Sequence, residues 1–148
     1  MTMKLDTVLH AGEAFKLRLK LTREVEQAAR AQRPYAVLAC VPQSLPGEIT
    51  ADAVNAVAEC VVGFVREQDI PGMAGRDIVV LGSAETDAAG AQALAHRLQN
   101  ELTLRSTPLR NTVWESGFAC LPEDGLTAEE LLDAAIRSAR TRRSRLAG

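Results

Sequence analysis

Two charged residues three positions apart, Arg66 and Asp69, have the types and the spacing that could bind a ligand. An arginine side chain can form two parallel hydrogen bonds with a phosphate, and its planar group can stack on a purine. The aspartate can accept hydrogen bonds from N–H groups. This Arg-x-x-Asp sequence occurs once in the chain. The pair could equally be an exposed ion pair at the C-terminal end of a helix, worth roughly 0.2–0.5 kcal/mol, so both interpretations stay open.

Other polar or aromatic residues have structural explanations that we favour. A basic run near the C-terminus could contact phosphate, but cations at a helix end also complement the helix dipole. Trp114 falls in an expected strand, where a core or dimer contact is favoured over base stacking. Glu123 and Asp124 fall in an expected turn without a partner for acid–base chemistry. The basic run consists of Arg137, Arg140, Arg142, Arg143 and Arg145.

Cysteine and histidine spacing gives no sign of a metal site or a disulfide framework. Cys40, Cys60 and Cys120 are widely separated in apolar runs, and no Cys-x-x-Cys pair occurs. His10 and His96 have no neighbouring cysteine or carboxylate pattern typical of metal ligands. We therefore expect buried, reduced thiols, and we expect neither a metal nor a cofactor.

Composition indicates one globular domain over residues 1–148. Apolar residues make up 47% and charged residues 24% of the chain, with a formal net charge of −2. This charge gives no general attraction to nucleic acid. Because no run approaches about 20 apolar residues, we expect no membrane segment, and the start of the chain lacks the apolar run of a signal peptide. We expect a cytoplasmic protein.

Periodicity and capping signals predict alternating helices and strands. Pro71-Gly72 is expected to form a turn, Thr50 to cap the second helix, and Thr127 with Glu130 to form a capping box. The resulting order is helix, strand, helix, strand, helix, strand, helix, an α/β arrangement without repeats. The expected helices cover residues 12–32, 50–65, 86–98 and 127–139, and the expected strands cover residues 35–41, 77–81 and 112–121.

Several of these segments together resemble the GGDEF family of diguanylate cyclases, from about Asp6 to Arg145. The most specific likeness is Ser116–Leu132, SGFACLPEDGLTAEELL, which is similar to the family pattern SIGVA.LPEDG.TAEELL. Phe15 through Leu38 look like the family's first helix and strand. Arg66–Asp69 precede Gly75–Val79 where the family has RxxD followed by its signature hairpin. The resemblance implies a single palm-like, ferredoxin-related domain with a mainly antiparallel central sheet.

The same resemblance implies that the catalytic residues are lost. Family cyclases hold metal ions through carboxylates at the end of the first strand and in the signature hairpin. Here the strand ends in Val41-Pro42-Gln43, and the ungapped signature becomes Gly75, Arg76, Asp77, Ile78 and Val79. The family lysine near the C-terminus is at best Arg143, and the opening loop, residues 6–15, has lost its Thr-Gly and Asn-Arg elements. We therefore expect no catalytic residues and no enzyme activity.

The resemblance also implies a second kind of site, an inhibitory site that binds cyclic di-GMP, and its residues are retained here. The five residues 70–74 separate Asp69 from Gly75, which is the family spacing, and Arg97 matches a further arginine of that site. The resemblance thus implies a cyclic di-GMP receptor that uses Arg66, Asp69 and Arg97 and signals to an unidentified protein partner. The alternative is a nucleotide-independent interaction module, such as a homodimer. Residual cyclase activity is the least favoured hypothesis.

Overall fold

The computed structural model describes the backbone of residues 3–43, 49–104 and 113–147, and side chains within residues 15–43, 49–104 and 113–141. Four helices and four strands occur within these ranges. They are α1 (Met3–Ala31), β1 (Tyr35–Pro42), α2 (Ala51–Val62), β2 (Ile70–Met73), β3 (Val79–Ala84), α3 (Ala88–Leu104), β4 (Trp114–Leu121) and α4 (Ala128–Ala147).

The strands form one antiparallel sheet in the order β2-β3-β1-β4. Strand β1 is central: Tyr35 pairs with Ala84 of β3 on one side and with Leu121 of β4 on the other. Strands β2 and β3 form a hairpin in which Met73 pairs with Val79. The expected single α/β domain with an antiparallel sheet is confirmed.

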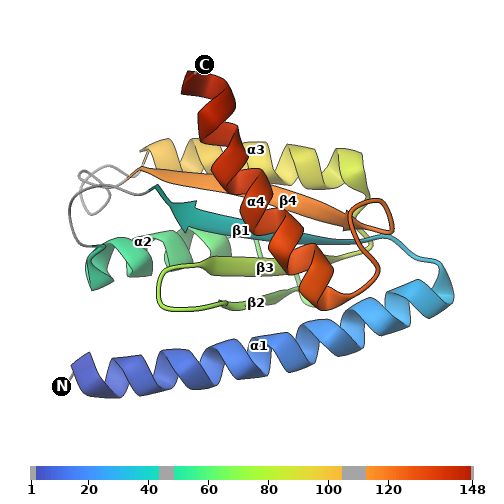
Figure 1. Cartoon of the computed structure of the whole chain (residues 1–148), viewed down its shortest axis with the longest axis horizontal. Helices are drawn as coiled ribbons and strands as arrows, with labels where there is room; N and C mark the ends of the chain where they lie inside the picture. Colours follow the sequence, from blue (N-terminus) through green and yellow to red (C-terminus); the bar gives the residue numbers. More distant parts are fainter. Residues whose placement is uncertain (1–2, 44–48, 105–112, 148) are drawn as a thin grey trace.

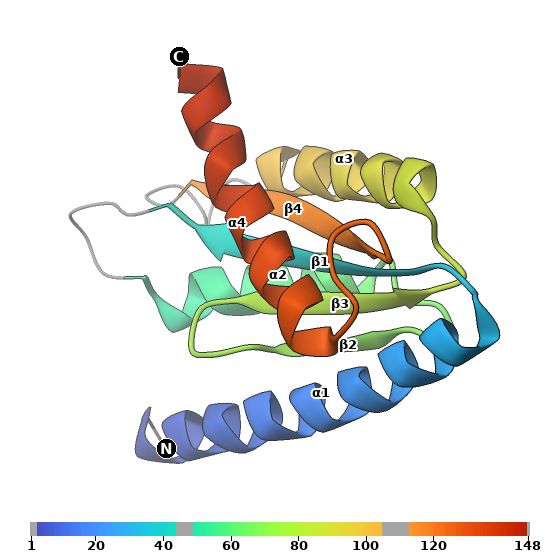
Figure 2. The same cartoon turned by 45° about the vertical axis from the view of Figure 1, so that its right-hand side comes forward.

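Helices cover both faces of the sheet, which explains why β1 is apolar throughout. Alternate side chains of a strand point to opposite faces. Ala36, Leu38 and Cys40 pack in the core under α2 and α3, whereas Tyr35, Val37 and Ala39 pack in the core under α1 and α4. Figure 1 shows α1 lying along the β2 side of the sheet and α4 crossing it, and Figure 2 shows the C-terminal part of α4 extending beyond it.

The expected turn at Pro71-Gly72 is wrong, because both residues belong to strand β2. Proline lacks the backbone N–H that each residue of a central strand donates to one of its two neighbouring strands. Strand β2 is at the edge of the sheet, where that donor is not needed on the open side. A fourth strand therefore joins the three that the sequence predicted.

Several element boundaries also differ from expectation. Helix α1 starts at Met3, so residues 6–15, expected as a loop, are helical. Strand β3 starts at Val79, two residues later than expected, and ends at Ala84, three residues later than expected. Helices α3 and α4 end at Leu104 and Ala147, six and eight residues later than expected. The remaining boundaries agree within three residues.

The predicted caps of α2 and α4 are largely confirmed. The Thr50 hydroxyl accepts a hydrogen bond from the Ala53 amide at 3.1 Å. The Thr127 hydroxyl accepts from the Glu130 amide at 3.1 Å. The Glu130 carboxylate accepts from the amide of Leu126, one residue before the position that a capping box uses.

Candidate functional site

The turn between α2 and β2 carries the Arg-x-x-Asp pair. Helix α2 ends at Val62, and the Gly63 amide donates to carbonyl groups of the last helical turn. Two further turns follow, with the Phe64 amide donating to the Val61 carbonyl at 2.9 Å and the Asp69 amide donating to the Arg66 carbonyl at 3.1 Å. The expectation that the pair lies at the C-terminal end of a helix is therefore wrong.

The Asp69 carboxylate is buried and held by Arg66. The Arg66 Nε donates to Oδ2 at 3.1 Å and its Nη2 donates to Oδ1 at 3.0 Å, which is a bidentate pair. The Arg66 backbone amide also donates to Oδ2 at 2.9 Å, and the Ala84 amide donates to Oδ1 at 3.4 Å. The side chain of Asp69 is 0% exposed and that of Arg66 is 49% exposed. The two residues therefore form an ion pair, as one interpretation expected, but its carboxylate is buried rather than exposed.

Arg66 also joins the turn to the end of β3. Its Nη2 lies 2.6 Å from the Ala84 carbonyl oxygen, 2.9 Å from Ser83 Oγ and 3.2 Å from Thr86 Oγ1. The Ser83 and Thr86 hydroxyl groups are 2.7 Å apart. The hydrogen bond to Asp69 raises the pKa of Arg66 above its usual value, so the guanidinium stays charged at physiological pH.

Arg66 and Arg97 line one groove of about 560 Å³, formed by the α2–β2 turn, the end of β3 and the first ten residues of α3. The guanidinium carbon of Arg97 lies 5.2 Å from the ring centre of Phe64, a cation–π distance that orients the arginine. Glu85 and Asp87 also line the groove. Asp69 does not line it, because its side chain is covered by its contacts with Arg66 and the end of β3.

The residues that align with the family signature, Gly75 to Val79, form the β2–β3 turn and the first residue of β3. The Ala74 amide donates to the Ile78 carbonyl at 2.9 Å. A Cβ atom on Gly75 would meet nothing within 4 Å, so no close contact requires glycine there. Arg76 is exposed, and Val79 begins β3.

The end of β1 lies beside this turn, because Cys40 pairs with Val79. Val41 is buried in the interior, and Gln43 is buried with its backbone amide donating to the Val113 carbonyl at 2.8 Å. Asp77 is the one carboxylate that the turn contributes. Magnesium sites require several oxygen ligands, usually carboxylates. The side chains at this place do not fit that requirement.

The other sequence candidates have structural contacts or lie outside the described side chains. Trp114 is 3% exposed and packs in the core under α2 and α3. Asp124 accepts a hydrogen bond from the Cys120 amide at 2.8 Å, so this turn residue does have a partner. Arg137 and Arg140 are exposed on α4, whereas the side chains of Arg142, Arg143 and Arg145 lie outside the described residues.

The three cysteines are buried and none of them forms a disulfide with another, as expected. Burial raises the pKa of the Cys40 thiol to about 12. Burial and nearby acidic side chains, chiefly Asp124, raise the pKa of the Cys120 thiol to about 11. Both side chains are therefore protonated at neutral pH and behave as small apolar residues.

Sequence reasoning missed Ser83, Thr86 and Asp87 as residues of this region. Hydroxyl groups at a strand end and an aspartate at a helix start are common capping residues, so nothing in their pattern indicates a site. Asp87 does cap α3, since its Oδ1 accepts from the Gly90 amide at 2.9 Å. Their place in the groove follows from the packing of β3 against the α2–β2 turn.

Comparison with known proteins gives structural matches. No family model matches the sequence, and no curated protein does. A sensory box/GGDEF family protein from Caulobacter crescentus matches with a TM-score of 0.69 and 21% identity over 89% of this chain and 91% of that one. The active GGEEF domain of a Vibrio cholerae diguanylate cyclase matches with a TM-score of 0.73 and 11% identity, over 88% and 89%. The fold is that of a GGDEF domain.

A third match concerns a ligand complex. The GGDEF domain of DgcB from Caulobacter crescentus, in complex with c-di-GMP, matches this GGDEF-like domain with a TM-score of 0.69 and 13% identity, over 86% of this chain and 80% of that one. At such identities the likeness establishes the fold alone. None of the described helices of this GGDEF-like domain is long and apolar enough to cross a membrane.

Proposed function

We propose that this GGDEF-like domain is a catalytically inactive receptor for cyclic di-GMP, which it binds in the groove lined by Arg66 and Arg97. The observation that carries the proposal is that two arginines, 31 positions apart in sequence, line the same concave surface. Arginine is the side chain best suited to pair with phosphate and to stack on purines. A bound ligand changes the surface that the groove presents. We therefore expect a protein partner to recognise the domain when cyclic di-GMP occupies the groove.

Asp69 has a different role in this proposal from the one that the sequence suggested. All its described hydrogen bonds come from Arg66 and from the Ala84 amide. Asp69 is therefore a positioning residue that fixes the Arg66 guanidinium, and the part of Arg66 that remains exposed faces the ligand. Pre-organisation of this kind lowers the entropy lost on binding.

Inactivity follows in this proposal from the side chains at the end of β1 and in the β2–β3 turn. Joining two GTP molecules requires metal ions that neutralise the triphosphates. Val41 has no ligand atom, and Arg76 brings a positive charge without any oxygen ligand. We expect no cyclic di-GMP from GTP and Mg²⁺ at micromolar protein concentration. Product above a protein-free control, measured by chromatography, would refute this part of the proposal.

Calorimetric titration with cyclic di-GMP tests binding. Arg97→Ala is the cleaner variant, because Arg97 is exposed and the structure records a single ring contact for it. Loss of a charged hydrogen-bond donor should weaken binding at least tenfold. Arg76→Ala, an exposed arginine in the β2–β3 turn, is the matched control and should bind like the parent. The absence of saturable binding by the parent at tens of micromolar would remove the proposal.

An interaction module is the second candidate, and one observation favours it. Phe15 and Leu19 are 64% and 48% exposed on α1, one helical turn apart. Such a pair suits a contact with another helix. This candidate predicts a concentration-dependent dimer by light scattering, which Phe15→Ser should abolish, without any response to nucleotide. The sheet itself offers no such surface within the described residues, since helices pack on both of its faces.

A further inference from the structure

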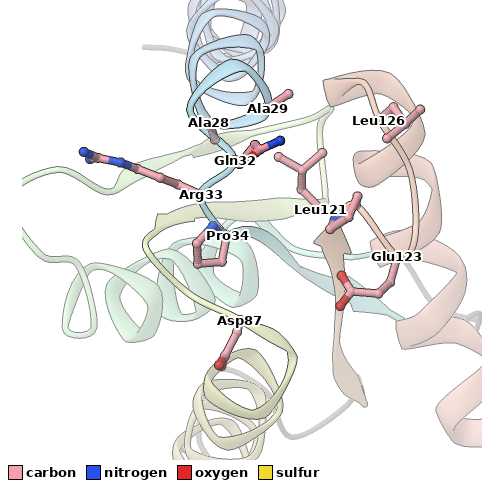
Figure 3. Close-up of a pocket in the computed structure, with 10 residues that line it drawn as sticks. Ala28, Ala29, Gln32, Arg33, Pro34, Asp87, Leu121, Glu123 and Leu126 are labelled. Atoms are coloured by element: carbon pink, nitrogen blue, oxygen red, sulfur yellow. The ribbon is translucent and has the colours of Figure 1, made fainter.

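A second hollow of about 430 Å³ adjoins the groove that contains the two arginines. It lies between the end of α1, the start of β1 and the turn between β4 and α4 (Figure 3). Pro34 and Asp87 line both hollows. Since they share these two residues, the two hollows lie side by side. Both volumes fall in the usual range for small-molecule sites.

The walls of the second hollow are mainly apolar. Leu126, which lies in the turn before α4, is 65% exposed although it is a large apolar side chain. Exposed apolar side chains around a concavity are typical of ligand sites. Flat ring systems suit such walls, because they bury both faces at little entropic cost. The apolar lining consists of Ala28, Ala29, Pro34, Leu121, Pro122 and Leu126.

The charge facing this hollow is negative. Figure 3 shows the Glu123 carboxylate directed across the hollow toward Pro34, whereas the Arg33 guanidinium points away from Glu123 and Leu121. Arg33 is instead 3.7 Å from the Glu85 carboxylate. A phosphate would be repelled here. A flat ring that carries N–H donors on one edge would be complementary, because a carboxylate can accept two such hydrogen bonds.

Guanine is the base with this donor pattern, at N1 and N2. A carboxylate can accept hydrogen bonds from both of these donors. The Asp69 carboxylate already accepts hydrogen bonds from Arg66 and from the Ala84 amide. Glu123 has no such commitment, because no hydrogen bond or ion pair is recorded for it among the described residues. The Asp87 carboxylate, by contrast, already accepts from the Gly90 amide.

We propose that the second hollow is a guanine subsite in which Glu123 accepts hydrogen bonds from the base. This inference rests on the proposed function, since the phosphates of the same ligand would lie against Arg66 and Arg97 in the groove. It assigns base recognition to the turn between β4 and α4, and phosphate recognition to the α2–β2 turn and α3. The domain would therefore discriminate guanine from adenine through Glu123.

Calorimetric titration of the full chain with cyclic di-GMP and with its adenine analogue, cyclic di-AMP, tests the subsite. Adenine presents an acceptor at N1 where guanine presents a donor, so a carboxylate should disfavour it. We expect Glu123→Gln to weaken cyclic di-GMP binding at least tenfold and to leave cyclic di-AMP binding unchanged or stronger. Glu26→Gln, on the exposed side of α1 and outside both hollows, should leave both affinities at parental values.

The outcomes separate the two proposals. If the parent does not bind cyclic di-GMP, both proposals are overturned. If the parent binds and Arg97→Ala weakens binding while Glu123→Gln does not, the receptor proposal survives and the guanine subsite is overturned. Amide chemical shifts give a readout without mutation: cyclic di-GMP should shift the amides of Glu123 and Leu126. Shifts confined to the α2–β2 turn and the first ten residues of α3 would contradict the subsite.

Discussion

Asp69 has no exposed side-chain surface, whereas its partner Arg66 keeps about half of its own side chain in contact with solvent. The two residues therefore differ in what happens when the other is removed. A buried carboxylate without a cation carries a large desolvation cost. An arginine that is already half exposed can be hydrated after it loses its partner, because its charged end reaches water.

This asymmetry gives a prediction for two variants. Arg66→Ala should lower the free energy of unfolding by about 3 kcal/mol, because it leaves the Asp69 carboxylate buried without its cation. Asp69→Ala should lower it by about half as much, because Arg66 can turn to water. Urea unfolding of both variants and the parent measures the difference. A larger loss for Asp69→Ala would contradict the pairing described here.

The buried thiol of Cys40 predicts a loss of stability at alkaline pH. Its pKa is about 12 in the folded chain, whereas an exposed thiol titrates near pH 8.5. The folded state therefore stays protonated to a higher pH than the unfolded state. The stability that Cys40 contributes is fully present below about pH 8.5 and is lost as pH rises toward 12. One such group contributes a slope of at most about 1.4 kcal/mol per pH unit.

The measurement is the urea unfolding midpoint between pH 8 and pH 10. Burial also raises the pKa of Tyr35, but in this pH range Tyr35 contributes less than Cys40 to the pH dependence of stability. Cys40→Ala should show a shallower decline than the parent, although its stability at pH 8 is lower because a cavity is left. Cys120→Ala is the comparison for the second thiol. An identical pH slope in the parent and Cys40→Ala would refute this assignment.

Helix α4 lies directly against strand β4 at Gly117. A Cβ atom placed on Gly117 would lie 2.7 Å from Ala139 Cα and 2.8 Å from the Ala135 carbonyl oxygen. Both are atoms of the helix backbone, which cannot rotate away as a side chain can. The absence of a side chain at Gly117 allows helix α4 to pack close to strand β4. This contact explains why the segment Ser116–Leu132 has a glycine at this position.

Two glycine variants test this at the level of elements. Gly117→Ala should destabilise the fold by about 2–3 kcal/mol, because α4 must move outward. Gly75→Ala is the matched control: its Cβ would meet no atom within 4 Å, and none of the described glycines has a positive φ angle. The control should be neutral or stabilising by up to about 1 kcal/mol. Thermal unfolding distinguishes them, and equal shifts would refute the role of the contact.

The elements themselves were largely predictable from local patterns. The residues of β1 form an apolar run because the strand is covered on both faces, and Thr50 and Thr127 cap helices as their sequence context indicates. Strand β2 could not be predicted, because Ile70–Met73 is short and contains proline and glycine. It is a strand because β3 provides the hydrogen-bonding partner, which is a tertiary effect.

At the scale of the molecule, the two hollows lie where the start of β1, the end of β3 and the end of β4 meet. Tyr35 pairs with Ala84 and with Leu121 in the sheet, which brings the neighbouring turns and helix ends together. The residues proposed to bind phosphate and guanine therefore come from segments that are far apart in sequence. Occupation of both hollows would connect the α2–β2 turn, α3 and the turn before α4.

Such a ligand should stabilise the whole domain by mass action. At a concentration of cyclic di-GMP one hundred times its dissociation constant, the free energy of unfolding should rise by about 2.7 kcal/mol. A thermal-shift titration measures this, and Arg97→Ala at the same ligand concentration should show a smaller rise. GTP is the control ligand for the β2–β3 turn and should give no shift. A shift with GTP but none with cyclic di-GMP would contradict the proposed function.

The sequence by itself determined the α/β class, the helix caps, the central strand and the spacing of Arg66, Asp69 and Gly75. Each of these depends on residues close together in the chain, so local pattern is enough. Only the tertiary structure decided that Asp69 is buried behind Arg66, that Arg97 shares a groove with Arg66, and that Glu123 faces a second hollow. These facts depend on burial and on the pairing of distant strands, because a carboxylate has the same chemistry in any sequence until packing decides whether water or a protein donor surrounds it.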